Sequence, residues 1–116
     1  MSNTSTSINP YAPLLTDKIA PGDIDANKHF YDTFGDCETE VSAGWIVRLC
    51  QEHGSWRGFT FEEIQAFYGR KWPERFWFNR LIDGKWIVAD GDSYYVTDEF
   101  IWRCHRASPM REGANK

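Results

Sequence analysis

Hydrophobic residues recur at helical spacing in the stretch before Gly54. Four of them and one histidine occupy positions i, i+1, i+4, i+5 and i+8, namely Trp45, Ile46, Leu49, Cys50 and His53. Side chains with this spacing share one face of a helix, and a glycine commonly stands just beyond a helix C-terminus. The pattern predicts a helix over roughly residues 38–53.

A capping box marks the start of a second helix. In Thr60-Phe-Glu-Glu63, the threonine hydroxyl and the glutamate carboxylate each accept a hydrogen bond from the other residue's backbone amide. The helix runs to about Tyr68, and Gly69 supplies a residue for a left-handed turn. Residues 55–59, between the first two helices, are too few for a helix and form at most a short strand.

A third helix follows almost at once. Pro73 suits its first turn, and Asp83-Gly84 ends it. A helical wheel places four hydrophobic residues on the inner side, namely Trp77, Phe78, Leu81 and Ile82. The same wheel leaves five residues on the outer side, namely Arg75, Phe76, Asn79, Arg80 and Asp83.

From Lys85 onward the pattern changes to β-prone runs. Residues 86–89 and 93–97 are rich in aromatic and β-branched side chains and flank Asp90-Gly91-Asp92, which predicts a hairpin. Thr97 then caps a last helix, with acidic residues in its first turn and basic residues in its last. The predicted fold class is mainly α with a small β-hairpin, in the order α-β-α-α-β-β-α.

Charge and polarity divide the chain into three parts. Residues 1–45 carry two basic and seven acidic residues, whereas residues 46–82 carry six basic and four acidic ones. The polar, proline-containing start predicts a flexible acidic N-terminal arm at residues 1–27. Residues 28–106 form the predicted domain, and residues 107–116 a disordered tail. Four apolar residues of the arm are candidates to dock on the domain, namely Ile8, Tyr11, Leu14 and Leu15.

Composition adds limits on the class of protein. The chain has 116 residues, 16% of them aromatic, and a net charge of -4, which fits one globular domain. No apolar run is long enough to span a bilayer, and the start lacks the pattern of a signal peptide. The 3 cysteines are odd in number and widely spaced, as is typical of buried thiols in a reducing compartment. We therefore expect a cytoplasmic protein that makes no contact with a membrane.

The element order resembles the winged-helix superfamily, a variant of the helix-turn-helix. The resemblance is carried by the Gly69 turn, by Leu81-Ile-Asp-Gly84-Lys-Trp-Ile87, and by Gly91 followed by Tyr95-Val-Thr97. These segments are similar to the end of the third helix, the wing and the start of the closing helix in bacterial regulators of the MarR and PadR type. The resemblance implies that the third helix enters a DNA groove or binds a protein. It also implies a homodimer, with the N-terminal arm or the last helix around Trp102 as the contact.

The outer side of the third helix carries residue types that read DNA. Arginine and asparagine pair with guanine and adenine edges, as Arg75, Asn79 and Arg80 would, and the Phe76 ring would meet a thymine methyl group. Arg70 and Lys71, at the preceding turn, would hold phosphates. We therefore expect a non-enzymatic regulatory module that binds double-stranded DNA through this helix. Five acidic residues nearby would repel DNA, namely Glu62, Glu63, Asp83, Asp90 and Asp92.

Protein binding through the same helix is the alternative. An outward Phe76 between Arg75 and Arg80 has the aromatic and arginine character of an interface hot spot, and acidic neighbours do not oppose it. A third interpretation is that Phe76 lies under the N-terminal arm and that the charged residues form a solvated helix face.

Metal-dependent and catalytic functions have weaker signals. Cys50 and His53 have zinc-ligand spacing with Cys104-His105 as possible further ligands, but adjacent residues point about 100° apart on a helix, so no metal or cofactor is expected. His29 and Asp32 are spaced as a base and its orienting group, without a nucleophile or cofactor motif nearby. We do not expect an enzyme.

Overall fold

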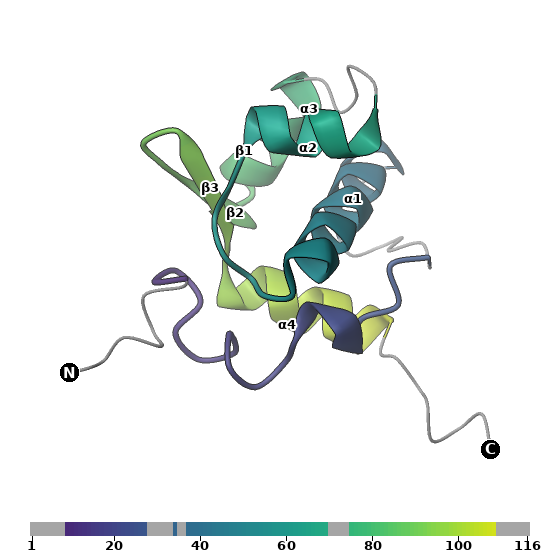
Figure 1. Ribbon diagram of the computed structural model, residues 1–116, viewed down its shortest axis with the longest axis vertical. Coiled ribbons are helices and arrows are strands. Elements are labelled where there is room, and N and C mark those ends of the chain that lie inside the picture. Colours follow the sequence, from purple (N-terminus) through teal and green to yellow (C-terminus); the bar gives the residue numbers. More distant parts are fainter. Residues whose placement is uncertain (1–8, 28–33, 35–36, 70–74, 109–116) are drawn as a thin grey trace.

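The computed structural model describes residues 9–27, 34, 37–69 and 75–108 (Figure 1). Helices α2 and α3 lie together at one end of the molecule, and α4 crosses the other end, with α1 between them (Figure 1). The hairpin projects to one side of the helices (Figure 1). In chain order the elements are the 3-10 helix η2 (Pro21–Asp23), α1 (Cys37–His53), β1 (Phe59–Thr60), α2 (Phe61–Tyr68), α3 (Arg75–Asp83), β2 (Ile87–Asp90), β3 (Ser93–Val96) and α4 (Asp98–Ala107).

Three short strands form one antiparallel sheet in the order β1-β3-β2. Phe59 of β1 pairs with Tyr94 of β3, and Ile87 of β2 pairs with Val96 of β3. Gly91 has φ 64°, which is typical of the first position in a type II′ hairpin turn. The prediction of a mainly α protein with a small hairpin is confirmed. Between the first two helices, where the sequence predicts at most a short strand, the structure has the two-residue β1.

Local signals place the helix ends. The Thr60 hydroxyl accepts a hydrogen bond from the Glu63 amide at 3.0 Å, and a Glu63 carboxylate oxygen accepts one from the Thr60 amide at 2.9 Å. Gly69 closes α2 with φ 87°. Thr97 caps α4 through the Phe100 amide. These three ends agree with the predictions because each depends on residues that are neighbours in the sequence.

The end of α3 differs in one respect from the expected glycine stop. The left-handed residue is Lys85, with φ 66°, and not Gly84. The Lys85 amide donates to the Ile82 carbonyl and the Trp86 amide to the Leu81 carbonyl, both at 3.0 Å, which is the Schellman pattern. Gly84 is required for a different reason, since a Cβ there would lie 2.7 Å from the Trp86 indole nitrogen.

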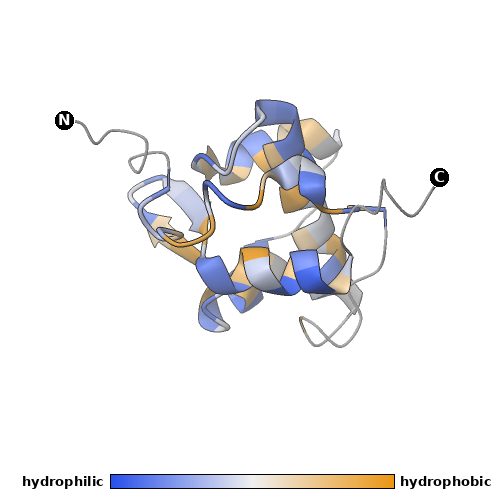
Figure 2. Cartoon of the chain, turned by 90° about the horizontal axis from the view of Figure 1, so that it is seen from below, coloured by the Kyte–Doolittle hydropathy of each residue, from blue (hydrophilic) through white to orange (hydrophobic). Residues whose placement is uncertain are grey.

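The core gathers one face of every helix and the inner side of the sheet. The helices carry both hydrophobic and hydrophilic residues (Figure 2), as is typical of amphipathic helices with one face on the core. Aromatic rings from distant elements meet edge to face, as Phe78 and Tyr94 do with centroids 4.8 Å apart. The largest fully buried side chains are Trp56, Phe59, Phe78, Phe100, Ile24, Ile46, Ile64, Leu81, Ile87, Ile101 and Val47.

Residues 9–27 differ from the flexible arm predicted for residues 1–27. Asn9 is buried and its side-chain nitrogen Nδ2 donates to the Val96 carbonyl at 2.9 Å. The Leu15 amide donates to the Asp98 carboxylate at 2.8 Å, and the Trp56 indole donates to the Ile19 carbonyl. A side chain of this segment thus satisfies a backbone carbonyl of the domain, and side chains of the domain satisfy backbone groups of this segment, so it is part of the fold. We call residues 9–27 the strap.

The docking candidates in the arm have different outcomes. Tyr11 contacts the hairpin, and the half-buried Leu15 packs against the core. Leu14 is 69% exposed, so its side chain does not dock. Ile8 lies outside the described residues.

The predicted domain and tail overlap the described residues in part. Ala107 is the last residue of α4, and Ser108 is buried and accepts a hydrogen bond from the Asp25 amide at 2.7 Å. The predicted tail therefore contributes its first two residues to the fold, and its remainder lies outside the described part. Within the described residues, no helix combines the length and apolar character needed to cross a membrane.

Candidate functional site

Helix α3 presents three of the predicted site residues to solvent. Phe78 and Leu81 are fully buried and hold one side of α3 against the core. Arg75, Asn79 and Arg80 are exposed, as the helical spacing predicts, and Asp83 is exposed at the end of the helix. We call Arg75, Asn79 and Arg80 the α3 face. Phe76 is a residue of α3 whose side chain is not described, and Arg70 and Lys71 lie outside the described residues.

Arg75 connects α3 to two other elements. Its guanidinium carbon lies 4.1 Å from the centre of the Phe61 ring of α2. A guanidinium nitrogen also donates to the Tyr94 hydroxyl of β3. The exposed cation is therefore held over the Phe61 ring and beside Tyr94 at the surface, which restricts how far it can reach toward a DNA base.

A cleft of about 330 Å³ lies between the start of α2, the start of α3 and the hairpin turn. Its walls combine aromatic rings with charges of both signs, because Glu62 and Asp92 carry carboxylates and Arg75 a guanidinium. The capping box satisfies the Thr60 and Glu63 amides at the start of α2, and the Glu62 carboxylate in the cleft would repel an anion there. We call this the hairpin cleft, lined by Thr60, Phe61, Glu62, Arg75, Gly91, Asp92 and Tyr94.

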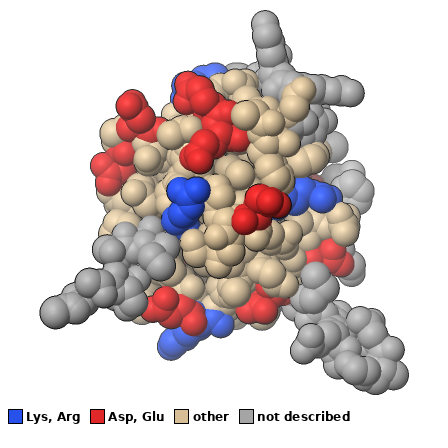
Figure 3. Space-filling model, in the orientation of Figure 1, with Lys and Arg blue, Asp and Glu red and all other residues tan. Residues whose placement is uncertain are grey.

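The part of the chain that includes α2, α3 and the hairpin carries slightly more acidic than basic residues. The segment from Phe59 to Val96 contains five basic and six acidic residues. At the hairpin turn both Asp90 and Asp92 are exposed, and the Tyr11 hydroxyl donates to Asp90 at 2.8 Å. Acidic side chains gather over the hairpin tip and α2 (Figure 3). The hairpin therefore carries the charge that a phosphate backbone would repel.

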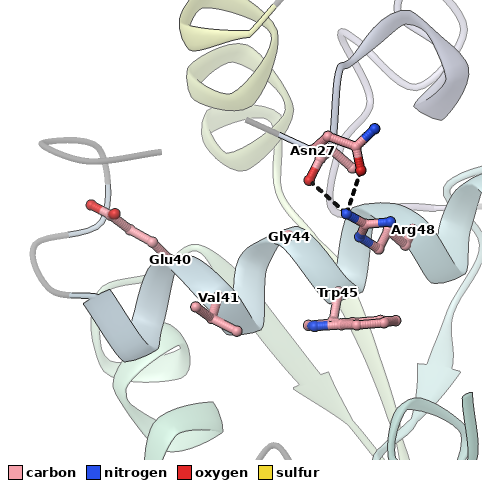
Figure 4. Close-up of a pocket in the computed structure, with 7 residues that line it drawn as sticks. Asn27, Glu40, Val41, Gly44, Trp45 and Arg48 are labelled. Atoms are coloured by element: carbon pink, nitrogen blue, oxygen red, sulfur yellow. Dashed lines mark hydrogen bonds between the residues drawn. The ribbon is translucent and has the colours of Figure 1, made fainter. Parts of the chain in front are cut away.

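A second hollow, of about 130 Å³, lies along α1. On one side of α1, Arg48 donates to the Asn27 side chain at 2.6 Å (Figure 4). Val41 and Trp45 project from the other side, and the Glu40 carboxylate is directed away from Arg48 (Figure 4). The Arg48 guanidinium also lies 5.1 Å from the Trp45 ring centre. These contacts attach the end of the strap to α1, so this hollow has a structural explanation.

The residues considered for metal or covalent chemistry do not form a site in the described part of the chain. Burial raises the pKa of Cys50 to about 12 and raises that of Cys104, so neither thiol ionises readily near neutral pH. Burial lowers the pKa of His53, which lies 4.0 Å from Glu63. Among the described residues, no three histidine, cysteine or acidic side chains are grouped as metal ligands. His29 and Asp32 lie outside them.

Four features of this region were missed by reasoning from the sequence. The sequence pattern indicated Phe61 and Tyr94 only as core or strand residues, and Asp92 only as a turn residue whose charge would repel DNA. Their meeting with Arg75 depends on the pairing of β1 with β3, which no local pattern reveals. The left-handed Lys85 was missed because glycine next to it is the stronger signal for that conformation.

Comparison with known proteins adds no assignment. No family model, curated protein or solved structure matches the chain. The function is therefore argued from the geometry of the α3 face and the hairpin cleft.

Proposed function

We propose that the protein is a winged-helix-like binding module that recognises another protein through the α3 face and the hairpin cleft. The element order and the sheet order β1-β3-β2 support the winged-helix-like description, with α3 in the place of the recognition helix and the β2–β3 hairpin in that of the wing. Fold alone does not choose the partner, so the choice rests on the site.

The observation that carries the proposal is the engagement of Arg75 with Phe61 and Tyr94 beside two carboxylates. A guanidinium already stacked on rings, in a cleft that also holds Glu62 and Asp92, fits a protein surface of mixed charge and aromatic character. A polyanion would meet Asp92 and Asp90 at the position where a DNA-binding hairpin needs a cation. The acidic hairpin therefore favours protein over DNA.

Site-specific photocrosslinking tests this proposal. A benzophenone side chain at Asn79, on the α3 face, is expected to give a discrete adduct with a protein in extracts of the native cell. The same group at Arg103, exposed on α4 at the other end of the molecule, is the matched control and is expected not to give that adduct. The double substitution Arg75→Ala/Arg80→Ala should abolish the Asn79 adduct. Equal adducts from both positions would contradict the proposal.

DNA binding is the second candidate, and the exposure of Asn79 and Arg80 on one helix favours it. Fluorescence anisotropy with random-sequence duplex DNA across a salt series separates the two. Under the protein proposal, no binding is expected even at low salt. Under the DNA alternative, log affinity falls linearly with log salt, and each arginine removed from the α3 face reduces the slope by about one. Salt-dependent binding of this kind would overturn the proposal of protein binding in favour of DNA binding.

A further inference from the structure

Strand β2 is an edge of the sheet and borders an open groove. The sheet order β1-β3-β2 leaves one side of β2 without a partner strand among the described residues. A groove of about 480 Å³ runs along this side and is lined mainly by apolar side chains. Its lining residues are Ile82, Lys85, Ile87, Val88, Ala89 and Thr97. The hairpin projects to one side of the described helices (Figure 1), and no described strand pairs with this edge.

The hairpin register shows which backbone groups face the groove. Asp90 pairs with Ser93 across the two-residue turn, and such a closing pair exchanges hydrogen bonds. Bonded and non-bonded pairs alternate along an antiparallel ladder, so Val88 bonds to β3 while Ile87 and Ala89 direct their amides and carbonyls outward. A further strand could pair with β2 through the free amides and carbonyls of these two alternate residues, Ile87 and Ala89.

Charges of opposite sign stand at the two ends of this edge. Lys85 precedes β2 and lines the groove, whereas Asp90 and Asp92 lie at the turn. Lys85 is held with φ 66°, a conformation that glycine adopts more easily and that a lysine retains only against a steric penalty. A non-glycine residue kept in that conformation often marks a functional position.

We propose that the edge of β2 binds the same edge of a second copy of this chain, as an antiparallel pair about a two-fold axis. With Val88 opposite Val88, the outward groups of Ile87 in each copy meet those of Ala89 in the other. This register brings Lys85 of each copy to the end of the strand where the second copy carries Asp90 and Asp92. One Asp90 oxygen already accepts the Tyr11 hydroxyl, so Asp92 is the freer acid for this contact.

The charge pattern identifies the occupant as a copy and not an unrelated peptide. An edge with a cation at one end and acids at the other complements itself only when two copies run antiparallel, and a two-fold axis then forms each contact twice. A parallel copy would place like charges together, which is unfavourable. The dimer contact shares Asp92 with the hairpin cleft, whereas the groove along β2 contains no residue of the α3 face. Self-association of the purified protein needs no partner protein, so a failure of this inference is distinguishable from a failure of the proposed function.

Sedimentation velocity across a concentration series tests this pairing. The wild-type protein is expected to shift from monomer to dimer as its concentration rises. Ala89→Pro removes the outward amide without touching the ladder to β3, since edge strands tolerate proline at such positions. It should raise the dimer dissociation constant about tenfold or more, because two hydrogen bonds are lost per dimer. Ala89→Val, which keeps the amide, should still dimerise.

A charge exchange tests the register. Lys85→Asp and Asp92→Lys are each expected to weaken the dimer about fivefold, since each single change disrupts two exposed ion pairs per dimer. The double exchange Lys85→Asp/Asp92→Lys should restore it, which a structural defect would not do. Lys85→Gly should weaken the dimer while raising the melting temperature of the dilute monomer.

Three results would overturn the proposal. The first is a wild-type protein that stays monomeric at the highest concentration tested. The second is a dimer that Ala89→Pro leaves intact, which would move the contact to another face such as that of Trp102. The third is a charge exchange that weakens the dimer further than either single change does.

Discussion

Arg75 has a structural role in addition to its place on the α3 face. Its guanidinium lies over the Phe61 ring and donates to the Tyr94 hydroxyl, which joins α3 to α2 and to β3. A cation over a ring face contributes about 0.5–1 kcal/mol at an exposed site. Substitution of Arg75 therefore changes folding stability as well as binding, and the two effects need separate measurements.

The stability effect of Arg75 is predicted from these contacts. Arg75→Ala should lower the free energy of unfolding by about 0.5–1 kcal/mol in urea titrations, because the aromatic contacts and one hydrogen bond are lost. Asn79→Ala, on the exposed face of the same helix, should change it by less than about 0.5 kcal/mol. Equal effects of the two substitutions would show that the contacts of Arg75 contribute nothing.

Lys85 is the second residue whose backbone carries a prediction. Lys85→Gly should raise the free energy of unfolding by about 1 kcal/mol, because glycine adopts a φ near 66° without the clash of a Cβ. Lys85→Ala removes the charge and keeps the Cβ, so it should not stabilise the protein. Chemical denaturation at a concentration where the protein is monomeric measures both, and a stabilising Lys85→Ala would be inconsistent with backbone strain as the cause.

At the scale of elements, the strap joins parts of the chain that are far apart in sequence. Asn9 reaches Val96 of β3, Leu14 and Leu15 reach the first turn of α4 at Asp98, and Gln51 of α1 donates to carbonyls of the strap. The Asp98 carboxylate, in the first turn of α4, accepts hydrogen bonds from the Leu14 and Leu15 amides of the strap and not from amides of its own helix. Stability of α4 and of the hairpin therefore depends on the strap.

The buried Asn9 side chain provides the measurement of that dependence. Asn9→Ala should lower the free energy of unfolding by about 1–3 kcal/mol, because the Val96 carbonyl loses its donor in a buried position and the Tyr11 amide loses its acceptor. Leu14→Ala in the same strap is the control and should have little effect, since Leu14 is 69% exposed. A negligible effect of Asn9→Ala would mean that the strap adds no stability.

At the scale of the whole molecule, the core of the described residues encloses the free thiols of Cys50 and Cys104. Cys50 and Cys104 are fully buried, and burial raises the pKa of Cys50 to about 12. An unfolded thiol has a pKa of about 8.5, so above that pH the unfolded chain releases a proton that the folded chain keeps. This stabilisation is complete below pH about 8.5 and is lost as the pH rises toward the folded pKa.

The resulting pH dependence can be measured. Between pH about 9 and 11, the free energy of unfolding should fall by about 1.4 kcal/mol per pH unit on account of Cys50. Tyrosine and lysine residues titrate in the same range, so the comparison is with Cys50→Ala, whose slope should be shallower by that amount. Identical slopes for the two proteins would contradict the burial of an un-ionised thiol at position 50.

The elements themselves were predictable because their signals are local. The Thr60–Glu63 capping box, the Thr97 cap and the Asp90–Ser93 turn each act over a few residues, so neighbouring side chains alone determine where α2, α4 and the hairpin begin. The exposed positions of α3 also follow from the helical period alone. Sequence by itself thus determined the helices, the hairpin and the outward residues Arg75, Asn79 and Arg80.

The tertiary structure decided what those residues meet. The strap looked like a flexible arm because its partners, such as Val96 for Asn9, lie far along the chain. Arg75 looked free to read DNA because its position over Phe61 and beside Tyr94 exists only after α2, α3 and β3 have assembled. Such contacts depend on the three-dimensional packing of distant segments, and hydrophobic periodicity carries no information about which segments those are.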